Sequence, residues 1–185
     1  MIDIKGDIEL KEAEVSIRTA LYYIRNNITR ETVKISIDGA HVKTNDTVHF
    51  DIWNFLIENG CRKIDGNDTR WQGIYEVSGN ETRLEICSQP GIGDVNVALP
   101  GGFKLRIESK KGTGKRSGQE YALMHEAIGQ LMTAQYESEN IIPVVAVPYS
   151  PKSYELANKW SEYNKIKDAN IHFILVYENG EIKYF

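Results

Sequence analysis

An alternating pattern over residues 93–110 constrains the fold more than any other part of the sequence. Hydrophobic residues occupy every second position of two short segments, and these segments flank Pro100, Gly101 and Gly102. Alternation with a period of two is typical of a β-strand that has one apolar and one polar face. Proline and glycine favour a turn between such strands. The pattern therefore predicts a β-hairpin whose loop is centred on Gly101.

The register of this hairpin follows from its symmetry. If Gly101 is the centre of a three-residue loop, residues at equal distances on either side of it face each other, and Asp94 then faces Glu108. Directly opposed side chains have Cβ atoms about 4.5–5.5 Å apart, so two such carboxylates repel each other unless a positive group lies between them. Lys110, on the same face, is one candidate for that group. A divalent cation is a better one, because hard cations bind carboxylate oxygens.

An aspartate at the start of one strand and Glu-x-Lys at the end of the next resemble the PD-(D/E)xK nuclease superfamily. Asp94 matches the first acidic position, Glu108 the second and Lys110 the lysine, whereas Gly93 stands where the family usually has proline. The resemblance covers roughly residues 47–148. It implies a restriction-endonuclease-like core and a metal-dependent DNA endonuclease of the restriction or junction-resolvase type. Such an enzyme uses Mg²⁺, for which Mn²⁺ substitutes, and is usually a homodimer.

The resemblance also implies which residues hold the metal. Asp94 and Glu108 would bind one or two Mg²⁺ ions, together with the carbonyl group of Ser109. The family often places a further acidic residue near the metal, on a helix before the core sheet, and Asp51 matches that position. Alternatively, Asp51 is simply one of the polar residues on the solvent-exposed face of the same predicted helix, which explains its presence equally well.

Two more residues receive catalytic roles from the resemblance. Lys110 would position the attacking water or stabilise the charge of the pentacovalent transition state. Gln130 lies on a helix predicted after the Glu-x-Lys strand, where several nuclease families of this fold carry a glutamine. Its amide would hold a phosphate, a water molecule or Lys110. A buried amide that bonds only to its neighbours is the alternative.

Contact with DNA requires a local basic patch, because the formal net charge of the chain is −4. The predicted patch comprises Lys104, Arg106, Lys111, Lys115 and Arg116. Exposed basic groups bind polyanions by releasing counterions from the phosphates, and they read no base sequence. We therefore expect these residues to follow the phosphate backbone. A solvated loop after Lys110 is the alternative for the last three.

The remaining pattern predicts an α/β protein with a mixed central β-sheet flanked by helices. Helices are predicted over residues 9–28, 46–59, 119–136 and 151–167, a hairpin over 32–43, and strands over 71–77, 82–88, 141–148, 171–177 and 181–185. We expect residues 1–44 to form an N-terminal helix and hairpin extension. Residues 45–185 are then the nuclease-like catalytic core.

Hydropathy favours an intracellular protein without membrane contact. No apolar run approaches the length of a transmembrane helix, and the N-terminus lacks the apolar core of a signal peptide. We therefore expect a cytoplasmic location.

Two other functions remain open at this stage. One is a non-catalytic nucleic-acid-binding or assembly protein on the same fold, because fold does not determine function. The other is an RNA nuclease, whose site chemistry would be the same. A second Glu-x-Lys, at Glu181 and Lys183, has no aspartate opposite it at hairpin spacing and indicates only a solvated strand face.

Overall fold

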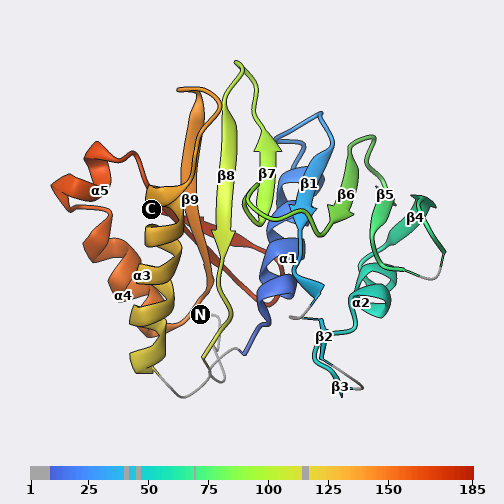
Figure 1. Cartoon of the computed structure of the whole chain (residues 1–185), viewed down its shortest axis with the longest axis horizontal. Helices are drawn as coiled ribbons and strands as arrows, with labels where there is room; N and C mark the ends of the chain where they lie inside the picture. Colours follow the sequence, from blue (N-terminus) through green and yellow to red (C-terminus); the bar gives the residue numbers. More distant parts are fainter. Residues whose placement is uncertain (1–8, 40–41, 45–46, 69, 114–116) are drawn as a thin grey trace.

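A nine-stranded mixed β-sheet forms the centre of the molecule, with helices on both of its faces (Figure 1). The computed structural model describes residues 9–39, 42–44, 47–68, 70–113 and 117–185. The sheet runs in the order β11-β10-β9-β8-β7-β1-β6-β5-β4. Its strands are β1 (Val33–Ser36), β4 (Cys61–Asp65), β5 (Gly73–Val77), β6 (Arg83–Cys87), β7 (Val95–Ala98), β8 (Lys104–Ser109), β9 (Ile141–Pro148), β10 (His172–Val176) and β11 (Ile182–Tyr184). A small separate ladder pairs β2 (Lys43–Thr44) with β3 (Thr47–Val48).

The helices lie in separate layers on the two faces of the sheet. They are α1 (Glu12–Arg25), α2 (Ile52–Glu58), α3 (Ser117–Thr133), α4 (Pro151–Trp160) and α5 (Asn164–Asp168). Helix α1 has one apolar side, which packs on the middle of the sheet and is almost completely buried. Helices α3 and α4 pack on the opposite face, over β9 and β10. The sheet is therefore covered on both sides near β8 and β9.

Strand β9 shows why this part of the sheet is apolar on both faces. Val144 and Ala146 belong to the core under α1, whereas Val145 and Val147 belong to the core under α3 and α4. Successive side chains of a strand point to opposite faces, so a strand buried on both sides needs a continuous apolar run. The strand predicted over residues 141–148 is confirmed.

The β7–β8 hairpin has the predicted register. Val95 is opposite Ile107, and Val97 is opposite Leu105. The backbone N–H of Asp94 donates to the carbonyl oxygen of Ile107, which extends this pairing past the start of β7. Strand β8 pairs in parallel with β9 on its other side. The hairpin is thus an interior part of the sheet, and its open end lies next to α1 and α3.

The N-terminal segment differs from the expected extension. Strand β1 lies between β7 and β6, in the interior of the sheet, and α1 contributes to the main core. The hairpin expected over residues 32–43 does not form, because β1 pairs with β6 and β7 while β2 pairs with β3. The alternation in Val33 and Ile35 correctly indicates a strand. It contains no information about which distant strand is the partner.

Two expected helices also differ from the structure. The helix expected over residues 46–59 is shorter, because Asp51 caps α2 and residues 47–48 belong to β3. The helix expected over residues 151–167 is interrupted after Trp160 and resumes as α5. Strand β4 was not anticipated. No helix within the described ranges is long and apolar enough to cross a membrane.

Candidate functional site

Asp94 and Glu108 lie next to each other at the open end of the β7–β8 hairpin. The backbone N–H of Ser109 donates to Asp94 Oδ2 at 2.7 Å and fixes that carboxylate against β8. Glu108 is buried, with 7% of its surface exposed, and Asp94 is partly exposed. The register predicted from the sequence therefore brings Asp94 and Glu108 together in the structure.

Burial makes this carboxylate pair costly to ionise. Burial and then the charge of Glu108 raise the pKa of Asp94 to about 7, against the opposing effect of the Ser109 hydrogen bond. Burial likewise raises the pKa of Glu108, although the charges of Lys110 and Arg106 oppose this shift. One proton shared by two nearby carboxylates relieves their repulsion, and a bound cation would do the same.

Lys110 is a buried ammonium group beside this pair. Only 3% of the residue is exposed, and its Nζ donates to Glu126 Oε1 at 2.9 Å. Burial alone would lower the pKa of Lys110, but the hydrogen bond to Glu126 and the negative charges of Glu12, Glu126 and Asp94 outweigh it, so the pKa is raised. Lys110 is therefore a cation in the folded protein. The sequence pattern did not predict the contact between Glu126 and Lys110.

Asp94 lines two cavities at this end of the sheet. The larger has a volume of about 760 Å³, and its walls include Asp38, Asp94, Arg106, Glu108 and Gln130. The smaller has a volume of about 200 Å³, and its walls include Glu12, Asp38, Asp94, Lys110 and Gln130. Gln130 is exposed and lines both cavities.

Two acidic residues at the site were missed by the sequence analysis. Glu12 lies in the first turn of α1, and its charge raises the pKa of both Asp94 and Glu108. Asp38 follows β1 and lines both cavities. The signal for Glu12 was an acid in the first turn of a predicted amphipathic helix. The sequence did not indicate a role for Asp38 at the site, because Asp38-Gly39 also suits a hairpin turn.

Asp51 is not at the site, which corrects its expected role as a metal ligand. Its carboxylate caps α2 by accepting hydrogen bonds from the backbone N–H and the side-chain amide of Asn54, at 3.1 and 2.7 Å. Helix α2 packs on β4, the edge strand, and β5, β6 and β1 separate β4 from β7 (Figure 1). Helix α2 precedes the hairpin in sequence, which is why the resemblance implied a role for Asp51. Of the two helices that precede the hairpin in sequence, α1 is the one that reaches the site.

The expected basic patch is only partly assembled near the site. Lys104 is exposed at the far end of β8, and Lys111 is exposed directly after Lys110. Lys115 and Arg116 lie outside the described residues. The remaining member, Arg106, lines the larger cavity.

Arg106 holds two loops together at the wall of that cavity. It donates to the carbonyl oxygen of Gly91 at 2.9 Å and to that of Gln135 at 3.3 Å, and its guanidinium lies over the ring of Tyr136. These contacts fix the loop that leads into Asp94. The structure therefore gives Arg106 a supporting role in addition to any contact with a ligand.

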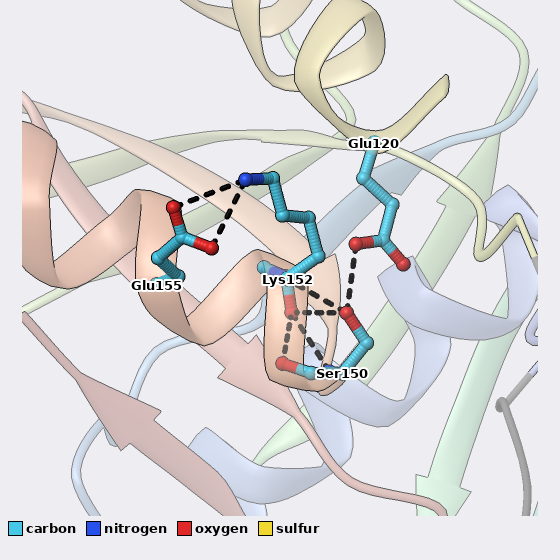
Figure 2. A network of polar contacts seen from close by, with 5 residues as sticks. Glu120, Ser150, Lys152 and Glu155 are labelled. Atoms are coloured by element: carbon cyan, nitrogen blue, oxygen red, sulfur yellow. Dashed lines mark hydrogen bonds and ion pairs between the residues drawn. The ribbon is translucent and has the colours of Figure 1, made fainter. Parts of the chain in front are cut away.

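A hydrogen-bond network fastens α3 beside the site (Figure 2). Glu120, in the first turn of α3, accepts from Ser150 Oγ at 2.8 Å and from Thr113 Oγ1 at 3.3 Å. Ser150 also caps α4, because Ser150 and Ser153 exchange side-chain to backbone hydrogen bonds. The network joins the end of β9, the start of α4 and the segment after Lys110 to α3. It therefore fixes the helix that carries Glu126 and Gln130.

The donor set at the site suits a hard cation that keeps most of its water. Within the described ranges, no group of three or more histidine, cysteine, aspartate or glutamate side chains is arranged to hold a metal ion. Asp94 and Glu108 nevertheless offer two adjacent carboxylates at the wall of an open cavity. Mg²⁺ is commonly bound by one or two carboxylates, several waters and substrate phosphates. The residues present therefore fit Mg²⁺ better than a metal that requires a closed cage of side chains.

Comparison with known proteins gives no relative on which to base a function. No family model, no curated protein and no solved structure matches this chain. The function must therefore be argued from the geometry of Asp94, Glu108 and Lys110.

Proposed function

We propose that the protein is a Mg²⁺-dependent nuclease with a restriction-endonuclease-like core, and that it hydrolyses phosphodiester bonds of DNA. One observation supports this proposal above the others. Two carboxylates with raised pKa values, Asp94 and Glu108, lie together at the wall of a cavity of about 760 Å³, and a buried ammonium group, Lys110, lies beside them. The two carboxylates suit a divalent cation, and the fixed ammonium group beside them suits the phosphate of a nucleic acid.

Each of the three residues has a separate task in this proposal. Asp94 and Glu108 hold the cation, which when bound polarises the scissile phosphate and lowers the pKa of its water. Both carboxylates would be ionised in that state, so cation binding would release to solvent any proton that their raised pKa values retain. Lys110 places a positive charge beside them and stabilises the negative charge that develops on the phosphate.

Neighbouring residues would orient the nucleic acid. Gln130 presents an uncharged amide to both cavities, which suits a phosphate oxygen or a water molecule. Lys111 is exposed directly after Lys110, and we assign it, together with Lys104, Lys115 and Arg116, to the phosphate backbone. Loss of such contacts weakens binding to all sequences and reduces the salt dependence by about one unit of slope per phosphate contact.

A cleavage assay tests the proposal. Supercoiled plasmid, branched DNA and RNA are incubated with wild type, Asp94→Asn and Glu108→Gln, each with Mg²⁺ or with EDTA. Glu155→Gln is the control, because Glu155 lies on α4 and its hydrogen bonds, among the residues that the structure describes, come from Lys152 (Figure 2).

We expect wild type and the control to cleave DNA with Mg²⁺ and not with EDTA. Both site variants should lose cleavage while keeping their thermal stability, since removal of one charge relieves repulsion in the pair. Cleavage of RNA without cleavage of DNA would contradict the proposed DNA substrate and indicate an RNA nuclease. If none of these substrates is cleaved in a metal-dependent manner, the proposal is contradicted, and a non-catalytic nucleic-acid-binding or assembly protein is the remaining alternative.

A further inference from the structure

We propose that Glu126 is a positioning residue that anchors the ammonium group of Lys110 at the candidate site. This inference rests on the function proposed above and assigns a further residue to it. The contact itself is a property of the folded protein and is testable without any cleavage. Glu126 lies on α3, and Lys110 follows β8, so the anchor also couples a helix to the strand that carries Glu108.

The burial of the two partners is strongly unequal. The Lys110 side chain is 4% exposed, whereas that of Glu126 is 56% exposed, and the two charged groups meet at 2.9 Å. A lysine side chain has four rotatable bonds and a point charge without directional preference, so its position depends on what binds the ammonium group. A buried ammonium group without a partner is strongly unfavourable. Glu126 provides the partner and reaches it from the rim of the site.

A bound cation would increase the need for this anchor. The charges of Asp94 and Glu108 interact favourably with that of Lys110 in the metal-free protein, but a divalent cation bound by these two carboxylates would neutralise their negative charge. The cation would then repel the ammonium group at short range. Glu126 is not one of the two carboxylates proposed to hold the cation, so its hydrogen bond to Lys110 Nζ would retain the lysine beside the site.

The neighbouring glutamine does not replace this anchor. Gln130 lies one helical turn after Glu126 on α3 and lines both cavities. Within the described ranges, the hydrogen bond found for Lys110 Nζ goes to Glu126. An amide is also neutral and cannot offset the charge of a cation. Gln130 is therefore available for the substrate, while Glu126 holds the lysine.

The chain contains a matched control for this contact. Glu155 binds Lys152 at 3.0 Å, and its side chain is 59% exposed, so both its exposure and its distance to lysine are close to those of Glu126. The difference is the lysine, because the Lys152 side chain is 34% exposed and has access to water. Glu126→Gln and Glu155→Gln thus remove the same charge from equally exposed positions. Only the first removes it from a buried lysine.

Steady-state kinetics on plasmid DNA test the positioning role. We expect Glu126→Gln to lower kcat by about tenfold to a hundredfold, the scale of a misplacement of about 1 Å, with little change in KM or in Mg²⁺ affinity. Glu126→Asp should recover part of the loss, because it restores the charge. Glu155→Gln should cleave like wild type. Unchanged or faster cleavage by Glu126→Gln would overturn the inference, as would a loss that Glu126→Asp does not recover.

A double-mutant cycle tests the anchor without using cleavage. Urea unfolding is measured for wild type, Lys110→Met, Glu126→Gln and the double variant, and for the same set at Lys152 and Glu155. We expect clear coupling between Lys110 and Glu126 and little between Lys152 and Glu155, because exposed ion pairs contribute little. Equal coupling in both cycles would overturn the anchor. If wild type fails to cleave but coupling is found, the proposed function fails and the contact stands.

Discussion

Gly93 is the residue at which the sequence departs from the superfamily pattern, and the structure gives a physical reason. Its φ is +81°, whereas proline is fixed near −65° and cannot adopt this conformation. A Cβ atom at this position would lie 2.9 Å from Cγ of Arg106. Arg106 passes over Gly93 to reach the carbonyl oxygen of Gly91. The glycine is therefore required by the arginine that packs against it.

Gly93→Ala should destabilise the protein more than an alanine at a comparable glycine. Gly180 has a similar φ of +84°, and a Cβ atom there would have no neighbour within 4 Å, so Gly180→Ala introduces backbone strain alone, at about 1–2 kcal/mol. Gly93→Ala adds the contact with Arg106 and should cost about 1 kcal/mol more. Urea denaturation measures both. Equal losses would show that Arg106 moves aside without cost.

The raised pKa of Asp94 predicts how stability depends on pH in metal-free protein. The group binds its proton more tightly in the folded state, at about 7, than the ordinary value of 3.8. This contribution to stability is fully present below about pH 4 and is lost as pH rises toward about 7. The free energy of unfolding should therefore fall by up to about 1.4 kcal/mol per pH unit in that window, the slope for one proton.

Comparison with Asp94→Asn isolates this effect. The asparagine variant lacks the titrating group, so its unfolding free energy in EDTA should fall less than that of wild type between about pH 4 and pH 7. Denaturant titrations at several pH values measure the difference. Parallel curves for the two proteins would mean that Asp94 is not perturbed as described.

At the scale of elements, strand pairings within one short segment were easier to predict than pairings between segments that lie far apart in the sequence. The β7–β8 hairpin was predictable in register because its turn residues and its alternation lie in one short stretch. The place of β1 was not, since its partners β6 and β7 are far away in sequence. The residues of the candidate site show the same difference between local and distant neighbours. Asp94 and Glu108 belong to one hairpin, whereas Glu12 and Glu126 come from two helices.

The cap of α4 should contribute more stability than the cap of α2. Ser150→Ala removes the N-cap bond to the Ser153 N–H and the bond to Glu120, both in buried or part-buried surroundings. We expect a loss of about 1–2 kcal/mol, the upper part of the usual range for an N-cap. Asp51→Ala removes an exposed cap from a short helix, and we expect about 0.5–1 kcal/mol. Thermal or urea unfolding compares the two, and the reverse order would contradict the network in Figure 2.

At the scale of the whole molecule, the N-terminal segment belongs to the same core as the rest of the chain. Helix α1 covers the middle of the sheet, and β1 joins β7 to β6. The expected division at residue 44 would separate these elements from the sheet that they complete. Composition and periodicity indicate that α1 is an amphipathic helix. They do not indicate whether its apolar side packs on this sheet or on another surface.

Removal of residues 1–44 should therefore abolish cooperative folding. The remaining chain would have a gap between β7 and β6 and an uncovered apolar face where α1 packs. We expect residues 45–185 to lose the sharp thermal transition and the near-ultraviolet circular dichroism of the full chain. A stable, cooperative fragment would show that the N-terminal segment is an extension after all.

The central claim is that Asp94 and Glu108 hold a divalent cation beside Lys110. Isothermal titration calorimetry with Mg²⁺ and Mn²⁺ on wild type, Asp94→Asn, Glu108→Gln and Lys110→Ala tests it most directly. The account predicts cation binding by wild type, marked weakening in both carboxylate variants, and retained binding in Lys110→Ala, in which both carboxylates remain. Equal cation binding by wild type and the two carboxylate variants, or no binding by wild type, would contradict it.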